Sequence, residues 1–218
     1  MSKTSIYIVC HDEASYNHFC SNNPDIKDKV IFLFVGKPHI IRGEGLYLDS
    51  FTNNIEKHKT LLTFTAWYAL VKNNLVKSKF VGIFEYDTIL KPEILSLSDG
   101  QLKDDHSVIG FAPRPTNEKI YLDAVNGLVE VLPSIYIVNA YAGSAVWSAS
   151  TNMIMPKWFL TDFVNWYDGY WRETLKYPNH PHFHERAVNV YAATIGMQYK
   201  FFPEWVRHEE KRSHRIEL

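Results

Sequence analysis

The amino-acid sequence predicts an α/β fold, with a mostly parallel central sheet flanked by helices and a less regular second half. Four short apolar runs each end in polar residues, which is typical of strands buried on both faces of a parallel sheet. A helical pattern separates the second run from the third, as a crossover between parallel strands requires. With 46% hydrophobic and 22% charged residues among 218, the chain has the composition of a globular domain with a substantial core.

The predicted central strands are the four runs themselves. They cover residues 5–10, 29–35, 79–84 and 108–112. The clearest helix spans about residues 55–72, because apolar residues recur there at three- and four-residue spacing, from Leu61 to Val71. Asn53 or Asn54 is the predicted N-cap of this helix.

The second half of the chain has a mixed pattern. Residues 128–132 and 135–138 flank a Pro-Ser pair and suggest a short antiparallel excursion. Residues 157–171 and 185–195 have helical patterns, and residues 198–202 predict a last strand. No repeat, low-complexity tract or linker interrupts the chain, so we expect a single domain.

Composition excludes several classes of protein. The 23 basic and 24 acidic residues leave a net charge of -1, whereas a protein that grips duplex phosphates is normally basic. The two cysteines do not make a disulfide scaffold, and Cys10 is expected to be a buried free thiol. No secretory signal and no apolar stretch of roughly 18 residues is present, so we expect a soluble, cytoplasmic protein. A piece of a longer polypeptide would look the same.

The most informative motif follows the third predicted strand. In Glu85-Tyr86-Asp87 two carboxylates stand two residues apart, so in an extended segment they point to the same side. The carboxyl ends of strands are where open α/β sheets bind ligands. Adjacent carboxylates repel each other unless a cation joins them, and Mg²⁺ or Mn²⁺ prefers oxygen ligands. An ordinary acidic turn after a strand is the alternative, because such triplets are common.

The order of these elements, together with the acidic triplet, resembles the GT-A class of nucleotide-sugar glycosyltransferases. In that class a DxD motif at this place binds a divalent ion that bridges the donor diphosphate. Glu85 departs from the first position of the motif, so Asp87 is the surer ligand. The sequence also resembles the N-terminal glycosyltransferase domain of a large chlorella-virus protein involved in capsid glycan synthesis. The resemblance implies a nucleotide-binding half over residues 1–115 and an acceptor-side half over residues 116–218.

The resemblance also implies residues that bind the donor. The end of the first strand would hold the base and ribose through Val9, Cys10, His11 and Glu13, with Tyr86 nearby. Three cations would meet diphosphate or ribose oxygens, although each could be an ordinary surface charge: Lys37, Arg42 and Lys59. Small residues that let the donor sugar approach the backbone, or that make a tight turn, are Ala142, Gly143 and Ser144. A late histidine would complete the metal ligands Glu85 and Asp87; His208 matches its placement, and His214 is the competitor.

Glu185 opens the predicted helix over residues 185–195. A carboxylate at a helix N-terminus is favoured by the helix dipole, which is consistent with a plain capping role. The resemblance instead implies that Glu185, acting with Asp87 in catalysis, is the general base that takes the proton of the acceptor hydroxyl. In a retaining enzyme it would only orient sugar hydroxyls.

Two further groups of residues have competing interpretations. His180, His182 and His184 alternate in a way that suits zinc, but neither paired cysteines nor a His-Glu-x-x-His spacing accompanies them. Aromatic residues that could stack on an acceptor sugar, or belong to the core, are Trp147, Trp166, Tyr167 and Trp171.

We therefore expect a glycosyltransferase of the hexosyl or deoxyhexosyl type that depends on Mn²⁺ or Mg²⁺. It would transfer a sugar from a nucleoside diphosphate donor, UDP-linked by the resemblance, to a glycan hydroxyl in viral capsid glycosylation. The expected partners are a nucleotide sugar and a glycan acceptor, with no nucleic acid and no membrane span. A nucleotidyltransferase and a non-catalytic glycan-binding module stay open as alternatives. The first would normally need a glycine-rich basic loop after the first strand, and residues 11–14 do not supply one.

Overall fold

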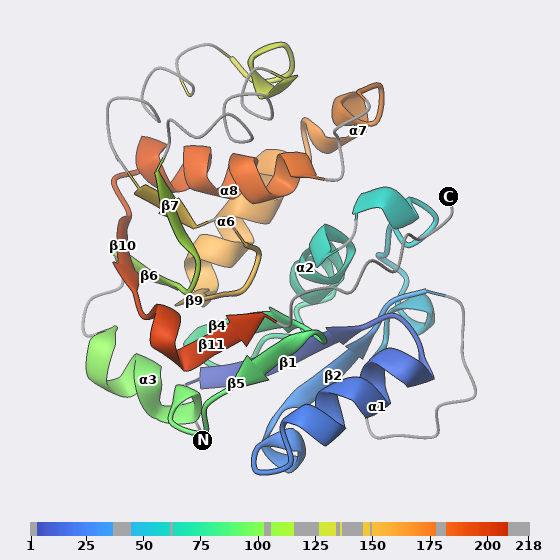
Figure 1. The fold of residues 1–218 in the computed structure, drawn as a ribbon. Coiled ribbons are helices and arrows are strands. Elements are labelled where there is room, and N and C mark those ends of the chain that lie inside the picture. Colours follow the sequence, from blue (N-terminus) through green and yellow to red (C-terminus); the bar gives the residue numbers. More distant parts are fainter. Residues whose placement is uncertain are drawn as a thin grey trace.

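The computed structural model describes most of the chain. The described residues are 4–36, 45–61, 63–102, 106–115, 127–133, 136, 146–148, 150–177 and 182–208. They form a seven-stranded, mostly parallel sheet flanked by helices, in the order β10-β6-β9-β4-β1-β2-β3 (Figure 1). The predicted fold class is therefore confirmed.

The first half of the chain supplies one side of the sheet with parallel strands. These are β1 (Thr4–Cys10), β2 (Ile31–Phe34), β3 (Leu46–Tyr47) and β4 (Phe80–Glu85). In the β1–β4 pair Val9 lies opposite Glu85, and in the β1–β2 pair Cys10 lies opposite Phe34. The carboxyl ends of β1, β2 and β4 therefore lie at the same edge of the sheet.

The other side of the sheet combines strands from both halves. It contains β6 (Ser107–Gly110), β9 (Met153–Pro156) and β10 (Gln198–Phe201). Strand β9 lies between β4 and β6 and is antiparallel to both, whereas β10 is parallel to β6. Both halves of the sequence thus contribute to the same sheet.

Two small antiparallel sheets, each of two strands, accompany the main sheet. Strand β5 (Thr88–Leu90) pairs with β11 (Val206–His208), and β7 (Pro113–Pro115) pairs with β8 (Val146–Ser148). The β5–β11 pair joins the last described strand of the chain to the segment that follows β4.

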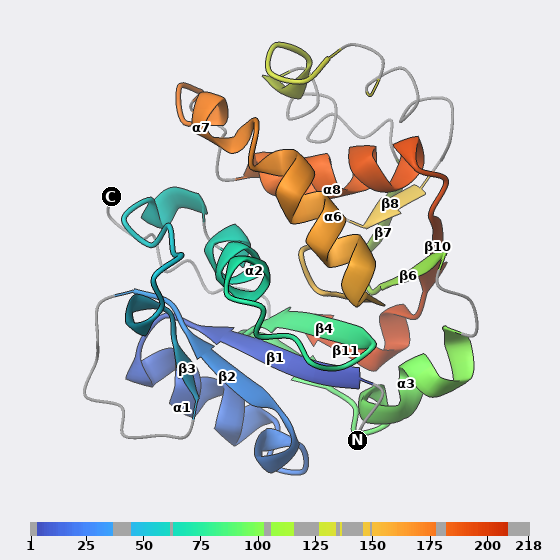
Figure 2. The ribbon, with the colours of Figure 1, turned by 180° about the vertical axis from the view of Figure 1, so that it is seen from behind.

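Helices cover the two faces of the sheet, as the two ribbon views agree (Figures 1 and 2). The α-helices are α1 (Glu13–Asn22), α2 (Thr63–Lys72), α3 (Ile94–Gln101), α6 (Lys157–Tyr167), α7 (Trp171–Thr174) and α8 (Phe183–Thr194). Short 3₁₀ turns are η1 (Lys27–Lys29), η2 (Leu48–Ser50), η3 (Lys59–Leu61) and η5 (Pro203–Trp205). None of the helices in the described part of the chain has the length and apolar character needed to cross a lipid bilayer.

Alternate residues of β1 enter two separate cores. Tyr7 and Val9 pack with α2, α6 and α8 on one face of the sheet. Ile6, Ile8 and Cys10 pack with α1 and α3 on the other face.

The structure corrects the predicted N-terminus of the helix over residues 55–72. The α-helix begins only at Thr63, because the preceding residues make tighter turns, with Leu61 N donating to His58 O at 2.9 Å. Asn53 is not the N-cap. Its side chain instead donates to Lys72 O at the far end of α2, at 3.2 Å.

The strand predicted over residues 128–132 is also wrong. Residues 127–129 are helical, and Leu132 N donates to Leu128 O at 2.7 Å, a bond between residues four apart. Leu128 and Leu132 are both buried, and their four-residue spacing, which fits either element, here belongs to a helical turn. Of the partner strand over residues 135–138, all but Tyr136 lie outside the described residues.

Candidate functional site

The candidate site lies where β1 and β4 end. Tyr86 N donates to Val9 O at 3.2 Å, and Val35 N donates to Cys10 O at 2.9 Å, so backbone bonds tie the three strand ends together. This arrangement brings the His11 and Tyr86 rings into an edge-to-face contact, with their centroids 5.7 Å apart. The ring contact therefore brings side chains from the ends of β1 and β4 together.

The predicted base-binding residues divide into two kinds. The side chains of Val9 and Cys10 are fully buried in opposite cores, so only their backbone could contact a ligand. Cys10 is a free thiol, as expected, and burial raises its pKa. His11 and Glu13 are exposed beside the N-terminus of α1. They are the members of this group whose side chains are able to contact a nucleotide.

Glu85 is anchored at the end of β4. Its Oε1 atom accepts hydrogen bonds from the hydroxyls of Thr63 at 2.8 Å and Thr151 at 3.3 Å. Its backbone N–H donates to Asn152 Oδ1 at 2.7 Å. Thr63 is the first residue of α2, so the carboxylate of Glu85 is fixed between that helix and the segment that leads into β9.

Asp87 lies in a tight corner after β4, with 6% of its surface exposed. Thr88 Oγ1 donates to Glu85 O at 2.5 Å across the turn. Asn23, just after α1, donates to Thr88 O at 2.9 Å and accepts from Leu90 N at 2.8 Å, which fixes the segment that follows. These bonds give Asp87 a rigid backbone at the edge where ligands are expected.

His208 is brought to this corner from the end of the described chain. In the β5–β11 pair its backbone lies opposite Thr88, the neighbour of Asp87. The backbone of His208 is described, but its side chain is outside the described part of the structure. Among the side chains that the structure describes, no group of three or more His, Cys, Asp or Glu residues is placed to hold a metal ion. The oxygen donors at the corner suit a hard divalent cation, and the predicted ligand set Glu85, Asp87 and His208 stays a prediction.

The N-terminus of α8 adds a second group of charged residues. Glu185 Oε2 accepts from Arg186 Nη1 at 2.9 Å, and Glu185 Oε1 lies 3.6 Å from His182 Nδ1. Burial alone would raise the pKa of Glu185, but contact with His182 and the charge of Arg186 outweigh it and lower that pKa. Glu185 is therefore a carboxylate at neutral pH.

His182 links this group to the end of β4. Its contact with Glu185 raises the pKa of His182, and the negative charge of Glu85 contributes in the same direction. Glu85 and Glu185, 100 residues apart in sequence, therefore act on the same imidazole. Because an imidazole with acidic neighbours favours its charged form, both carboxylates stabilise the protonated state of His182.

His184 is not part of this group, although it lies next to Glu185. Its side chain is buried against the rings of Phe64 and Trp67, at centroid distances of 6.1 and 6.4 Å. Burial lowers the pKa of His184 to about 4, so the ring is neutral. His182 is exposed while His184 points into the core, so the two do not share the zinc site considered from the sequence.

Several predicted residues cannot be placed. Those outside the described residues are Lys37, Arg42, Ala142, Gly143, Ser144, His180 and His214. Lys59 lies in η3, but its side chain is outside the described part of the structure. Of the candidate stacking aromatics, three are at most 2% exposed and belong to the core: Trp147, Tyr167 and Trp171. Trp166 is half-buried and packs against Tyr136, Tyr170 and Tyr191.

Sequence reasoning missed the residues that hold the carboxylates. Thr63, Thr151 and Asn152 fix Glu85 from positions far away in the sequence, and no local pattern marks them. His182 and Arg186 did carry a signal. His182 stands three residues before Glu185, a spacing at which side chains on a helix are neighbours, and Arg186 follows Glu185 directly, so that its signal was only a cation adjacent in sequence.

Comparison with solved structures defines the class of fold. It is a fold found in glycosyltransferases, and one solved structure that resembles this chain is the apo form of WbbM, a bifunctional glycosyltransferase. The TM-score is 0.63 at 14% sequence identity, over 95% of this chain and 45% of the WbbM chain. This chain thus spans less than half the length of that protein, and the likeness concerns the fold. No protein-family model and no curated protein sequence matches the chain.

Proposed function

We propose that the chain is a metal-dependent glycosyltransferase that moves a sugar from a nucleoside diphosphate donor to a hydroxyl group of a glycan. The observation that supports this proposal is the presence of two acidic groups, one after β4 and one at the N-terminus of α8, in a fold found in glycosyltransferases. Asp87 lies in the corner after β4, and Glu185 lies at the N-terminus of α8, linked to the end of β4 through His182. One group suits the donor diphosphate with its cation, and the other suits the acceptor hydroxyl.

The donor would bind at the ends of β1 and β4. His11, Tyr86 and Glu13 would contact the base and ribose, and the backbone of Val9 and Cys10 would line the site. Asp87, with Glu85 and His208, would hold Mn²⁺ or Mg²⁺. When bound, such a cation offsets the negative charge that develops on the leaving diphosphate. Glu85 keeps one oxygen on the hydroxyls of Thr63 and Thr151, so Asp87 is the principal ligand in this proposal.

Glu185 would receive the proton of the acceptor hydroxyl as that oxygen attacks the anomeric carbon. The new bond joins the acceptor oxygen to the anomeric carbon, and the bond from that carbon to the diphosphate oxygen breaks. Glu185 is ionised at neutral pH, which a proton acceptor must be, and Arg186 and His182 hold it in place. If the anomeric configuration is retained, the same residue would orient sugar hydroxyls instead.

The finer details of the proposal rest on resemblance between sequences. They are a uridine donor, transfer of a hexosyl or deoxyhexosyl group, a role in viral capsid glycosylation and a cytoplasmic location. Donor contacts through Lys37, Arg42 and Lys59, and through the segment from Ala142 to Ser144, belong to this part of the proposal.

Binding of UDP, measured by isothermal titration calorimetry with and without Mn²⁺, tests the donor site. We expect the wild-type chain to bind UDP only with the cation, and Asp87→Asn to lose about 100-fold in affinity because a charged metal ligand is removed. Asp162→Asn, at an exposed position of α6, makes the same chemical change away from the site. Equal cation-dependent affinity in wild type and Asp87→Asn, with both chains folded by thermal unfolding, would remove the basis of the proposal.

A further inference from the structure

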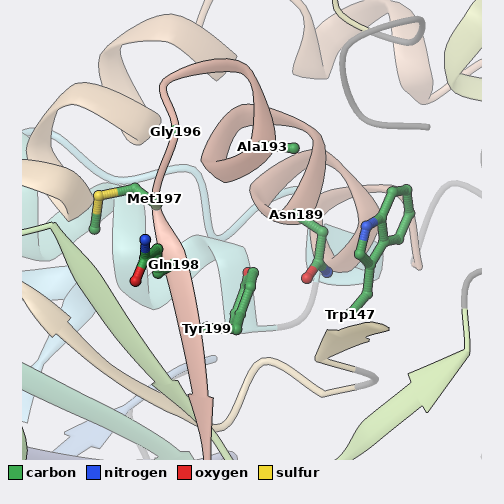
Figure 3. Close-up of a pocket in the computed structure, with 7 residues that line it drawn as sticks. All are labelled: Trp147, Asn189, Ala193, Gly196, Met197, Gln198 and Tyr199. Carbon is green, nitrogen blue, oxygen red and sulfur yellow. The ribbon is translucent and has the colours of Figure 1, made fainter. Parts of the chain in front are cut away.

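A pocket of about 270 Å³ lies between the C-terminal half of α8, the strand β8 and the start of β10 (Figure 3). It is lined by Trp147, Asn189, Ala193, Gly196, Met197, Gln198 and Tyr199. The volume suits a small ligand of about one ring rather than a nucleotide sugar.

The pocket is separate from the proposed donor site. Helix α8 runs from Glu185, near the carboxyl ends of β1 and β4, to Ala193 at the rim of the pocket. Eight residues of helix span about 12 Å at 1.5 Å per residue. Since β10 is parallel to β6, and β6 runs in the direction of β4, the start of β10 lies at the opposite edge of the sheet from Asp87. A ligand in the pocket would therefore not compete with a nucleotide at the end of β4.

The pocket has a buried floor and an exposed rim. Trp147 and Asn189 are at most 1% exposed and Met197 is 7% exposed, whereas Gly196 and Gln198 are open to solvent. Gly196 has a φ of +74°, and a Cβ atom there would meet nothing within 4 Å, so the rim is open on this side. Access to the pocket from the side of Gly196 is therefore unobstructed.

The lining is uncharged, and its polar side-chain groups are a phenol, two amides and the indole N–H of Trp147. The Asn189 amide is already engaged, because it exchanges hydrogen bonds with the backbone of Ser148 and donates to Glu185 O at 2.6 Å. The Tyr199 hydroxyl is buried and has no hydrogen-bond partner among the described residues. Figure 3 shows the Tyr199 ring extending from β10 toward α8, with its hydroxyl on the side of the helix. A buried hydroxyl without a partner costs stability, which a ligand hydroxyl would recover.

We propose that this pocket is a second saccharide-binding site that takes one neutral pyranose unit. The ring of Tyr199 suits the apolar face of a sugar ring, the Tyr199 hydroxyl and Gln198 amide suit its hydroxyl groups, and the buried Trp147 forms the apolar floor beneath them. The absence of a charged side chain from the described lining disfavours phosphate and carboxylate ligands, which would lose hydration without gaining a charged partner. This assignment rests on the proposed function in one respect, since a glycan acceptor is what supplies such a unit.

Ligand-observed NMR and calorimetry with the methyl glycosides of glucose, galactose and mannose test the site without nucleotide or metal. We expect at least one glycoside to bind the wild-type chain and to bind Asp87→Asn equally. Tyr199→Phe removes only the unpartnered hydroxyl and should weaken binding roughly tenfold, about 1.4 kcal/mol. Ala193→Phe fills the rim and should abolish binding, whereas Ile195→Phe, at an exposed neighbouring position outside the lining, should not.

The outcomes separate this site from the donor site. If none of the three glycosides binds, or if Ala193→Phe and Tyr199→Phe bind as wild type does while both chains are folded, the pocket is not a saccharide site. If glycoside binding is lost in Asp87→Asn, the sugar occupies the donor site, and the second site is also excluded. Failure of UDP to bind with Mn²⁺ would instead overturn the proposed transferase and leave the glycoside result standing.

Discussion

The two ends of helix α8 differ in charge although they belong to one 12-residue element. At the N-terminus, Glu185 contacts Arg186 and His182, and the charge of Glu85 acts on the same imidazole. At the C-terminus, an uncharged pocket is lined by Asn189, Ala193 and the residues that lead into β10. The helix dipole favours a carboxylate at its N-terminus, so the acidic residue stands at the favourable end.

The difference suggests that the two ends of α8 have separate functions. Groups that gain or lose a proton gather at the end near the strand termini, where the reaction is proposed. Groups that form only neutral hydrogen bonds gather at the other end, where recognition is proposed. Asn189 joins the two, because it bonds to Glu185 O and to the backbone of Ser148. Variants at the two ends should therefore change different quantities.

The largest effect is expected from Glu185→Gln, which removes the proposed base but keeps the size of the side chain. Transfer should slow by about 10²–10⁴-fold, with UDP affinity in the presence of Mn²⁺ nearly unchanged. Initial rates and calorimetry on the same preparation measure both. Glu93→Gln, at an exposed position before α3, is the matched control and should leave kcat unchanged. Equal losses in rate and donor affinity would show that Glu185 only supports the fold of the site.

A smaller effect, on stability, is expected from His184→Leu. The pKa of His184 is about 4 in the folded chain, whereas an unfolded histidine titrates near 6.5. Between these values the unfolded chain binds the extra proton, so wild-type stability should fall as the pH drops, by up to about 3 kcal/mol. His184→Leu should lose this part of the dependence, measured by urea unfolding at pH 7 and pH 4.5. His106→Gln, at an exposed position, should keep it.

If the free energy of unfolding changes equally with pH in wild type and in His184→Leu, His184 is not buried as a neutral group. Gln198→Ala, at the start of β10, neither adds nor removes a titratable group and should keep the wild-type dependence of stability on pH.

The smallest effect is expected from His182→Gln. The contact with Glu185 raises the pKa of His182, so its contribution is complete below about pH 6.5 and is lost as the pH rises through the folded value. Because 60% of the His182 side chain is exposed, the cost of His182→Gln at pH 6 should be under about 1 kcal/mol. A double-mutant cycle with Glu185→Gln at pH 6 and pH 9 measures the coupling, which should shrink at the higher pH. A coupling that grows with pH would contradict the assignment.

Much of the first half could be predicted from the sequence because its signals are local. The runs that became β1, β2, β4 and β6 are continuous and apolar, and the Glu85 to Asp87 triplet lies directly after one of them. Strand β9 gave no comparable signal. It has four residues, ends in a proline, and pairs with two strands from earlier in the chain.

The candidate site was only partly predictable for a similar reason. Asp87 and Glu185 could be singled out from their own surroundings, a strand end and a helix start. The contacts that hold Glu85, from Thr63, Thr151 and Asn152, depend on how distant segments pack. The error over residues 128–132 has a different cause: in a short apolar segment, the spacing of Leu128 and Leu132 fits a helical turn as well as a strand.

The position of β9 has a consequence for anyone who wishes to divide this protein. A recombinant fragment ending at residue 115 would lack the strand that separates β4 from β6, and each of these would have an open hydrogen-bonding edge. The remaining fragment would carry β9 without the two neighbours that complete its backbone bonds. Truncation libraries should therefore keep both pieces in one polypeptide, or supply them together so that they can reassemble.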